Sequence, residues 1–216
     1  MGPFHQIPED ALMTFLLAFT AGFIFYSQQI VANATALSKG RRRGVGAALA
    51  VLAGALAGDA LWAAGALVVV AISLQVEPLR VIFGVVGSFF FLRLAWAALL
   101  DARQNAMPRT DIADAQGGWR GGAQITFRNP YALGFWVGVA ALICLLTAPQ
   151  PLLSDFLLLF LGIMLGAGLW CGLLALRSVS APSATFFRLV NLIVGVLAAL
   201  IGVYGLWFVV THSLAG

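Results

Sequence analysis

Six long apolar stretches constrain the fold of this chain more than any other feature of its sequence. They are nearly free of charge and cover residues 11–37, 45–74, 79–100, 125–148, 152–176 and 189–210. Because a helix rises 1.5 Å per residue, crossing about 30 Å of hydrocarbon takes roughly 20 residues, and every stretch is at least that long. Unbroken apolar runs favour helices, since lipid offers no partner to backbone groups. We therefore predict an all-α, polytopic membrane protein with six transmembrane helices.

The composition agrees with one membrane domain over residues 1–216. Hydrophobic residues make up 62% of the chain and charged residues 9%, which leaves too little polar surface for a soluble domain. The net charge of +4 does not indicate nucleic-acid binding, because the cations stand at helix ends and not on one face. Cys144 and Cys171 lie inside predicted spans without a CxxC motif or a nearby histidine, so neither a metal site nor a structural disulfide is expected.

Lysine and arginine residues predict the orientation of the chain. With six spans, eleven of the twelve would face one side and only Arg80 the other. The positive-inside rule assigns the basic side to the cytoplasm, and both termini then lie outside. The first stretch follows Glu9 and Asp10 instead of a basic leader and is too long for a signal peptide, so we expect it to be retained.

The predicted spans divide into two halves around a polar segment. Residues 101–122 contain Pro108, Asp111, Asp114 and two Gly-Gly pairs, which predicts a cytoplasmic linker between the halves 1–100 and 123–216. Because three helices are an odd number, the halves would enter the membrane from opposite sides, which is the topology of a 3+3 inverted repeat. Comparing the two halves residue by residue does not by itself indicate a repeat.

Glycines four residues apart predict faces where helices approach closely. These pairs are Gly54–Gly58, Gly134–Gly138, Gly162–Gly166 and Gly168–Gly172. They would pack one compact bundle, or one of them would hold a homodimer together.

Asp59 is the residue that the bilayer should exclude most strongly. It lies near the middle of the second span, where a carboxylate costs roughly 2.5–3.5 kcal/mol. It must be paired, carry a proton or face a wet cavity, and each option suits ion or substrate coupling; a structural hydrogen bond is the alternative. Arg93 in the third span is the candidate cationic partner, unless its long side chain snorkels to the cytoplasmic surface.

A polar cluster in the first span predicts a binding site. Tyr26, Ser27, Gln28, Gln29 and Asn33 stand in the half that approaches the cytoplasm. Three of them, Tyr26, Gln29 and Asn33, share one helical face that should line a cavity. Hydrogen bonds that fix helix packing are the alternative.

The fourth span adds Arg128, Asn129 and Pro130 near its cytoplasmic boundary. Pro130 lacks a backbone donor and disfavours helix at Asn129, so we expect a local break there. A helix start beside Arg128 would attract a carboxylate or another anion, although proline in a first turn is also an ordinary helix start.

The chain resembles the LysE/RhtB family of amino-acid exporters over nearly its whole length, and the order of its motifs carries the resemblance. The similar segments are Ala36-Leu37-Ser38-Lys39-Gly40-Arg41-Arg42-Arg43-Gly44, Gly58-Asp59 with Trp62, Gly87-Ser88-Phe89-Phe90-Phe91-Leu92 and Phe127-x-Asn129-Pro130. Two positions depart from the family pattern. Phe25-Tyr26-Ser27 stands where the family has Pro-Gly-Pro, and Tyr131 stands where it usually has lysine.

The resemblance implies a bacterial inner-membrane protein that exports amino acids or related metabolites, driven by the proton motive force. In the orientation that the basic residues predict, its termini are periplasmic. It implies no enzyme activity and no cofactor, and its partners would be a small-molecule substrate and membrane lipid. We expect alternating access, with substrate between the first and fourth helices and protonation of Asp59 as the coupling event. Two alternatives stay open: a membrane thiol-redox protein that uses Cys144 and Cys171, and a passive channel or scaffold.

Overall fold

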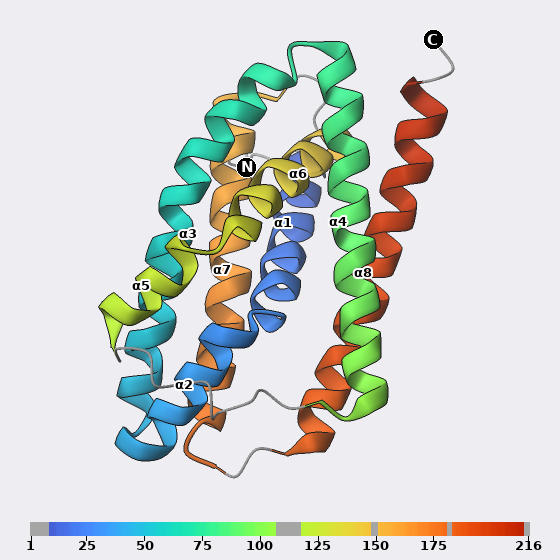
Figure 1. Cartoon of the computed structure of the whole chain (residues 1–216). Helices are drawn as coiled ribbons and strands as arrows, with labels where there is room; N and C mark the ends of the chain where they lie inside the picture. The colour runs from blue at the N-terminus through green and yellow to red at the C-terminus, as the bar shows by residue number, and fades with distance from the viewer. Residues whose placement is uncertain (1–8, 107–117, 148–150, 181–182, 214–216) are drawn as a thin grey trace, which may run out of the picture.

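The computed structural model describes residues 9–106, 118–147, 151–180 and 183–213, and Figure 1 shows their arrangement. Within these ranges the regular secondary structure is helical, as predicted. Five helices are long and apolar enough to cross a membrane, and there are six spans if the bent pair α5–α6 counts as one. The helices are α1 (Glu9–Ser27), α2 (Ile30–Arg43), α3 (Val45–Ser73), α4 (Glu77–Gln104), α5 (Trp119–Phe127), α6 (Pro130–Thr147), α7 (Leu153–Arg177) and α8 (Ala184–Ser213).

Four of the helices, α3, α4, α7 and α8, follow the predicted stretches closely. The third span is longer than predicted, because α4 continues to Gln104 and ends at Asn105, which has a left-handed backbone (φ 51°). Since α5 begins at Trp119, both ends of the predicted linker 101–122 are helical. Arg109 and most of the remaining linker lie outside the described residues.

The first span is broken, and the prediction of one helix over residues 11–37 is wrong. Helix α1 ends at Ser27 and α2 begins at Ile30. The break expected in the fourth span is confirmed, since α5 ends at Phe127, α6 begins at Pro130 and the two axes are bent by 70°. That span is also not the single helix predicted over 125–148, because its first part starts earlier and runs in another direction. Each half of the chain therefore opens with a broken helix.

The two breaks share one backbone hydrogen bond. The amide of Gln29 donates to the carbonyl of Tyr26 at 3.2 Å, and the amide of Asn129 donates to the carbonyl of Thr126 at 2.9 Å. The second helix of each broken pair begins at the next residue, α2 at Ile30 and α6 at Pro130. Tyr26 thus corresponds to Thr126, and Gln29 to Asn129.

Helix contacts at glycines repeat in the two halves as well. A Cβ on Gly54 of α3 would lie 1.9 Å from the carbonyl oxygen of Trp119 in α5, and a Cβ on Gly166 of α7 would lie 1.9 Å from that of Phe19 in α1. The reverse contacts agree, since Gly122 approaches the carbonyl oxygen of Val51 and Gly22 approaches that of Ile163. Helix α5 therefore packs on α3 as α1 packs on α7. Such pairing is what a 3+3 repeat requires.

The remaining long helices close the bundle. In Figure 1, α4 in green and α8 in red lie side by side, and α4 also packs against α6. The end of α2, the ends of α4 and α7 and the start of α8 all lie at the lower end of the view, whereas the α3–α4 connection lies at the upper end. The basic last turn of α2, with its three arginines, is therefore at the same end as the last turns of α4 and α7, which carry Arg103 and Arg177.

Candidate functional site

A buried carboxylate lies at the middle of the bundle. Asp59, on α3 near the middle of its length, is 0% exposed. The hydroxyl of Tyr26, in the last turn of α1, donates a hydrogen bond to Oδ2 of Asp59. The other oxygen, Oδ1, has no hydrogen-bond partner among the described residues. Asp59 is thus linked directly to the first broken helix.

Helix α7 contributes the third side of this centre. Cys171 is buried and lies near both Asp59 and Tyr26. Its neighbour Trp170 packs edge-on against Phe23 of α1, with ring centroids 5.7 Å apart. The carboxylate is therefore enclosed by α1, α3 and α7, and Tyr26 and Asp59 have little exposure to solvent or lipid.

The break between α1 and α2 contains neither proline nor glycine. Side-chain hydrogen bonds stabilise it instead. The amide nitrogen of Asn33 donates to the carbonyls of Tyr26 and Ser27, each at 3.1 Å. The indole nitrogen of Trp170 donates to the side-chain oxygen of Asn33 at 3.2 Å. Carbonyls that lose their helical donors at a break need such substitutes within a membrane. Asn33 therefore has a structural part in the break, as the packing alternative expects.

The next polar residue, Gln28, makes a similar bridge to α8. Its amide nitrogen donates to Oδ1 of Asn191 at 3.1 Å, while the hydroxyl of Ser27 donates to the carbonyl of Ile24 at 2.7 Å. Gln29 is different, because its buried amide nitrogen has no partner among the described residues. A donor in that position is available to a ligand.

A cavity of about 790 Å³ brings the two breaks together with α4. Its polar lining is Gln28, Gln29, Arg93, Asp101, Arg128 and Asn129, and its aromatic and apolar lining is Phe25, Val31, Phe90, Leu94, Trp96, Ala97, Leu100 and Ile125. This cavity is therefore lined by five of the residues that the sequence nominates for a site: Gln28, Gln29, Arg93, Arg128 and Asn129. Both arginines are exposed at the surface of the described chain.

The other nominated residues lie behind or outside this cavity. Tyr26, Asn33 and Asp59 form the buried layer next to it, and the side chain of Pro130 lies outside the described residues, as does that of Tyr131. Asp59 receives its hydrogen bond from Tyr26, while Arg93 stands on the cavity wall.

Sequence reasoning missed Asp101 because it assigned this residue to the linker. Helix α4 extends past it, and Arg93, Ala97 and Asp101 then follow one another at four-residue intervals on one face. It also missed Trp170, Asn191 and Thr126. These act through neighbours from distant parts of the chain, so a local pattern carries no signal for them.

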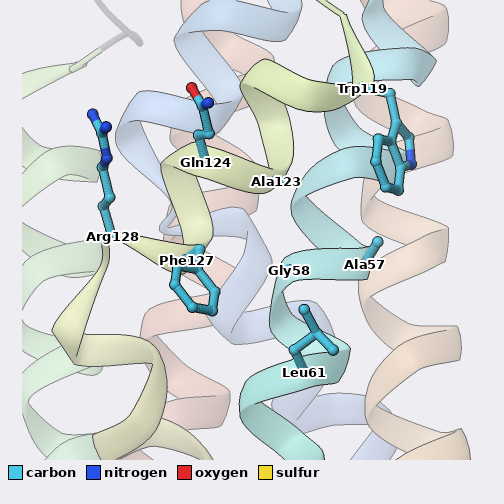
Figure 2. A pocket seen from close by; sticks show the side chains of 8 residues that line it. All are labelled: Ala57, Gly58, Leu61, Trp119, Ala123, Gln124, Phe127 and Arg128. Atoms are coloured by element: carbon cyan, nitrogen blue, oxygen red, sulfur yellow. The ribbon is translucent and has the colours of Figure 1, made fainter.

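A second, apolar cavity of about 290 Å³ lies on the other side of the α5 break, between α3 and α5. Figure 2 shows it between Leu61 and Trp119, with Phe127 at its side and the polar ends of Gln124 and Arg128 directed away from Leu61. Gly58 contributes backbone only, and the ring of Phe127 stacks on Trp62 at 5.6 Å between centroids. Arg128 is the residue common to both cavities.

The cysteines named in the thiol-redox alternative are both free and buried. They lie on α6 and α7, and Cys144 has 0% exposure. Within the described ranges no group of three or more His, Cys, Asp or Glu residues could hold a metal ion.

Sequence comparisons relate the chain to known proteins. The family model described as LysE type translocator matches residues 31–211. A curated protein named chemotactic transduction protein ChpE, from Pseudomonas aeruginosa, is 27% identical over 161 residues, which is 74% of this chain and 79% of that protein. No solved structure matches the chain.

Proposed function

The chain belongs to the LysE type translocator family, and we propose that it exports amino acids or related small metabolites across a bacterial inner membrane by proton-driven alternating access. Membership supports transport and a multi-pass membrane location. The substrate class, the driving ion, the inner membrane and the periplasmic termini belong to the proposal.

The observation that carries the proposal is the fully buried Asp59, of which one oxygen is bonded and the other has no partner in the described part of the chain. A charged carboxylate at this depth costs roughly 2.5–3.5 kcal/mol, and carboxylates kept in membranes are typical of proton relays. An ionised carboxylate only accepts hydrogen bonds, whereas a protonated one also donates. Protonation would therefore change the link between α3 and the last turn of α1, which leads directly into the cavity wall.

The cavity offers complementary groups for a zwitterion. Arg93 and Arg128 can bind a carboxylate, the unbonded amide of Gln29 can donate to it, and Asp101 can accept from an ammonium group. Phe25, Phe90 and Trp96 supply apolar contacts for a side chain. Both broken helices contribute to this wall, as in transporters whose discontinuous helices form the substrate site.

The test is export from proteoliposomes loaded with a radiolabelled amino-acid mixture under an imposed pH gradient. We expect gradient-driven export by the wild type, loss of its pH dependence in Asp59→Asn, and wild-type behaviour in Asp10→Asn, whose side chain is exposed at the start of α1. A ligand for the assay can first be found by thermal unfolding in detergent, because a bound molecule stabilises the folded state.

Two results would overturn the proposal. Export by Asp59→Asn at the wild-type rate and pH dependence removes the coupling role. Flux that ignores the gradient and shows no counterflow indicates the passive channel instead.

A further inference from the structure

Tyr26 and Thr126 occupy equivalent positions in the two halves of the chain. Each is in the last turn before a break, and each supplies the carbonyl that receives the amide of the residue three positions on. Both are buried, with exposures of 1% and 0%. Each carries a side-chain hydroxyl into the interior.

Only one of these hydroxyls has a partner in this arrangement. Tyr26 bonds Asp59, whereas Oγ1 of Thr126 has no partner among the described residues, and neither has Oδ1 of Asp59. Buried polar atoms without partners are rare and need an explanation such as a functional role.

The helix contacts place Thr126 beside the α3 segment that bears Asp59. A Cβ on Gly58 would lie 3.2 Å from Cβ of Thr126. Cys171 follows Gly166 in α7 at the same spacing as Asp59 follows Gly54 in α3, so Cys171 is the counterpart of Asp59. Tyr26 lies near Cys171, and by the same correspondence Thr126 lies near Asp59.

We propose that Thr126 is a second hydrogen-bond partner of Asp59, which takes the place of Tyr26 when the two halves exchange arrangements during transport. The inference rests on the proposed function, because it requires two alternating states. In a repeat, the second state gives each half the arrangement of the other, so the approach that Tyr26 now makes to Cys171 becomes an approach of Thr126 to Asp59. A hydroxyl suits this part because it can donate to the ionised carboxylate and accept from the protonated one. Thr126 is then a positioning residue for Asp59.

The surroundings of Asp59 limit which groups can affect its titration. From α1 it faces Tyr26 and from α7 it faces Cys171. The three arginines in the last turn of α2 adjoin the start of α3, whereas Asp59 is near the middle of α3. The neighbouring part of α5 contributes the hydroxyl of Thr126. A changed pH profile in Thr126 variants is therefore compared with that of Asp59→Asn, which removes this carboxylate.

The decisive variant is Thr126→Val, which removes the hydroxyl and keeps the shape. Because the hydroxyl bonds no described residue in the present arrangement, we expect unchanged or raised thermal stability in detergent together with export lowered about tenfold or more and a displaced pH profile. Thr126→Ser should restore export, and Thr126→Ala should act like Val if Val is not tolerated. The matched control is Thr35→Val, since the buried Thr35 hydroxyl bonds only the carbonyl of Val31 in its own helix.

A second measurement follows the balance between the two states. Ala97→Cys places a thiol on the exposed wall of the larger cavity, and labelling by a membrane-impermeant maleimide reports its accessibility. Thr126→Val should raise labelling because it disfavours the alternate state, and Tyr26→Phe should lower it because it removes the present partner.

The outcomes separate this inference from the proposed function. Wild-type export, pH profile and labelling in Thr126→Val overturn the role of Thr126 while Asp59→Asn remains uncoupled. Wild-type export in Asp59→Asn overturns the coupling role itself, and the role of Thr126 with it.

Discussion

The indole nitrogen of Trp170 on α7 donates a hydrogen bond to the side-chain oxygen of Asn33 on α2, at 3.2 Å. Asn33 in turn covers the carbonyls of Tyr26 and Ser27 at the end of α1. A residue from the second half of the chain therefore stabilises the break in the first half. This bond connects the bundle core to the cavity wall.

Replacing Asn33 by Leu should destabilise the protein. The change leaves two carbonyls and the Trp170 indole without partners, and each unsatisfied buried group costs about 1–3 kcal/mol. Thermal unfolding in detergent measures the loss. Thr20→Val is the control, because its hydroxyl is exposed and bonds only its own helix. Equal stability of the two variants would contradict a structural role for Asn33.

Gly166→Ala should destabilise the packing of α7 on α1 more than Gly168→Ala does. A Cβ at Gly166 would lie 1.9 Å from the carbonyl oxygen of Phe19, whereas a Cβ at Gly168 meets nothing within 4 Å. Forcing atoms into a packed contact costs on the order of 1–3 kcal/mol, and here the obstacle is backbone. Size-exclusion profiles and thermal unfolding of both variants give the comparison.

The repeat makes a further prediction for α3. Gly54→Ala should be as damaging as Gly166→Ala, because its Cβ would meet the carbonyl oxygen of Trp119 at the same 1.9 Å. Gly65→Ala, which meets nothing within 4 Å, is its control. A harmless Gly54→Ala beside a damaging Gly166→Ala would show that the two halves are not packed equivalently.

Arg128→Gln should weaken substrate binding more than it slows the saturated rate. Loss of one charged hydrogen bond to a carboxylate corresponds to roughly 1.4 kcal/mol or more, which is about tenfold in apparent affinity. Initial export rates against internal substrate concentration separate the two effects. Arg120→Gln changes an exposed arginine on α5 outside both cavities and should retain wild-type affinity. Equal effects of both variants would point to surface charge alone.

Cys144→Ala should leave export unchanged, and neither native cysteine should react with maleimide until the protein is denatured. Both thiols are free and buried, and reactive thiols are normally accessible and activated by their surroundings. Mass spectrometry of labelled protein before and after denaturation checks this. Rapid native labelling, or export that depends on reductant, would favour the thiol-redox alternative.

The class of fold and the positions of most spans follow from the sequence by itself. Insertion into a bilayer depends on the summed transfer free energies of residues that are consecutive in the chain, so long apolar runs predict α3, α4, α7 and α8. The second break was also predictable, because Pro130 acts on the backbone directly before it. Asp59 was also recognisable from the sequence, because a carboxylate within a long apolar run is costly in a bilayer.

Only the tertiary structure decided the first break, the partner of Asp59 and the match between the halves. The break at Gln28 and Gln29 contains no proline or glycine, and it depends on hydrogen bonds involving Asn33, Trp170 and Asn191. The halves agree in backbone contacts made by glycines, which a comparison of side chains does not detect. Local composition determines whether a segment enters the membrane, whereas a break or a buried charge is stable only if distant residues supply its partners.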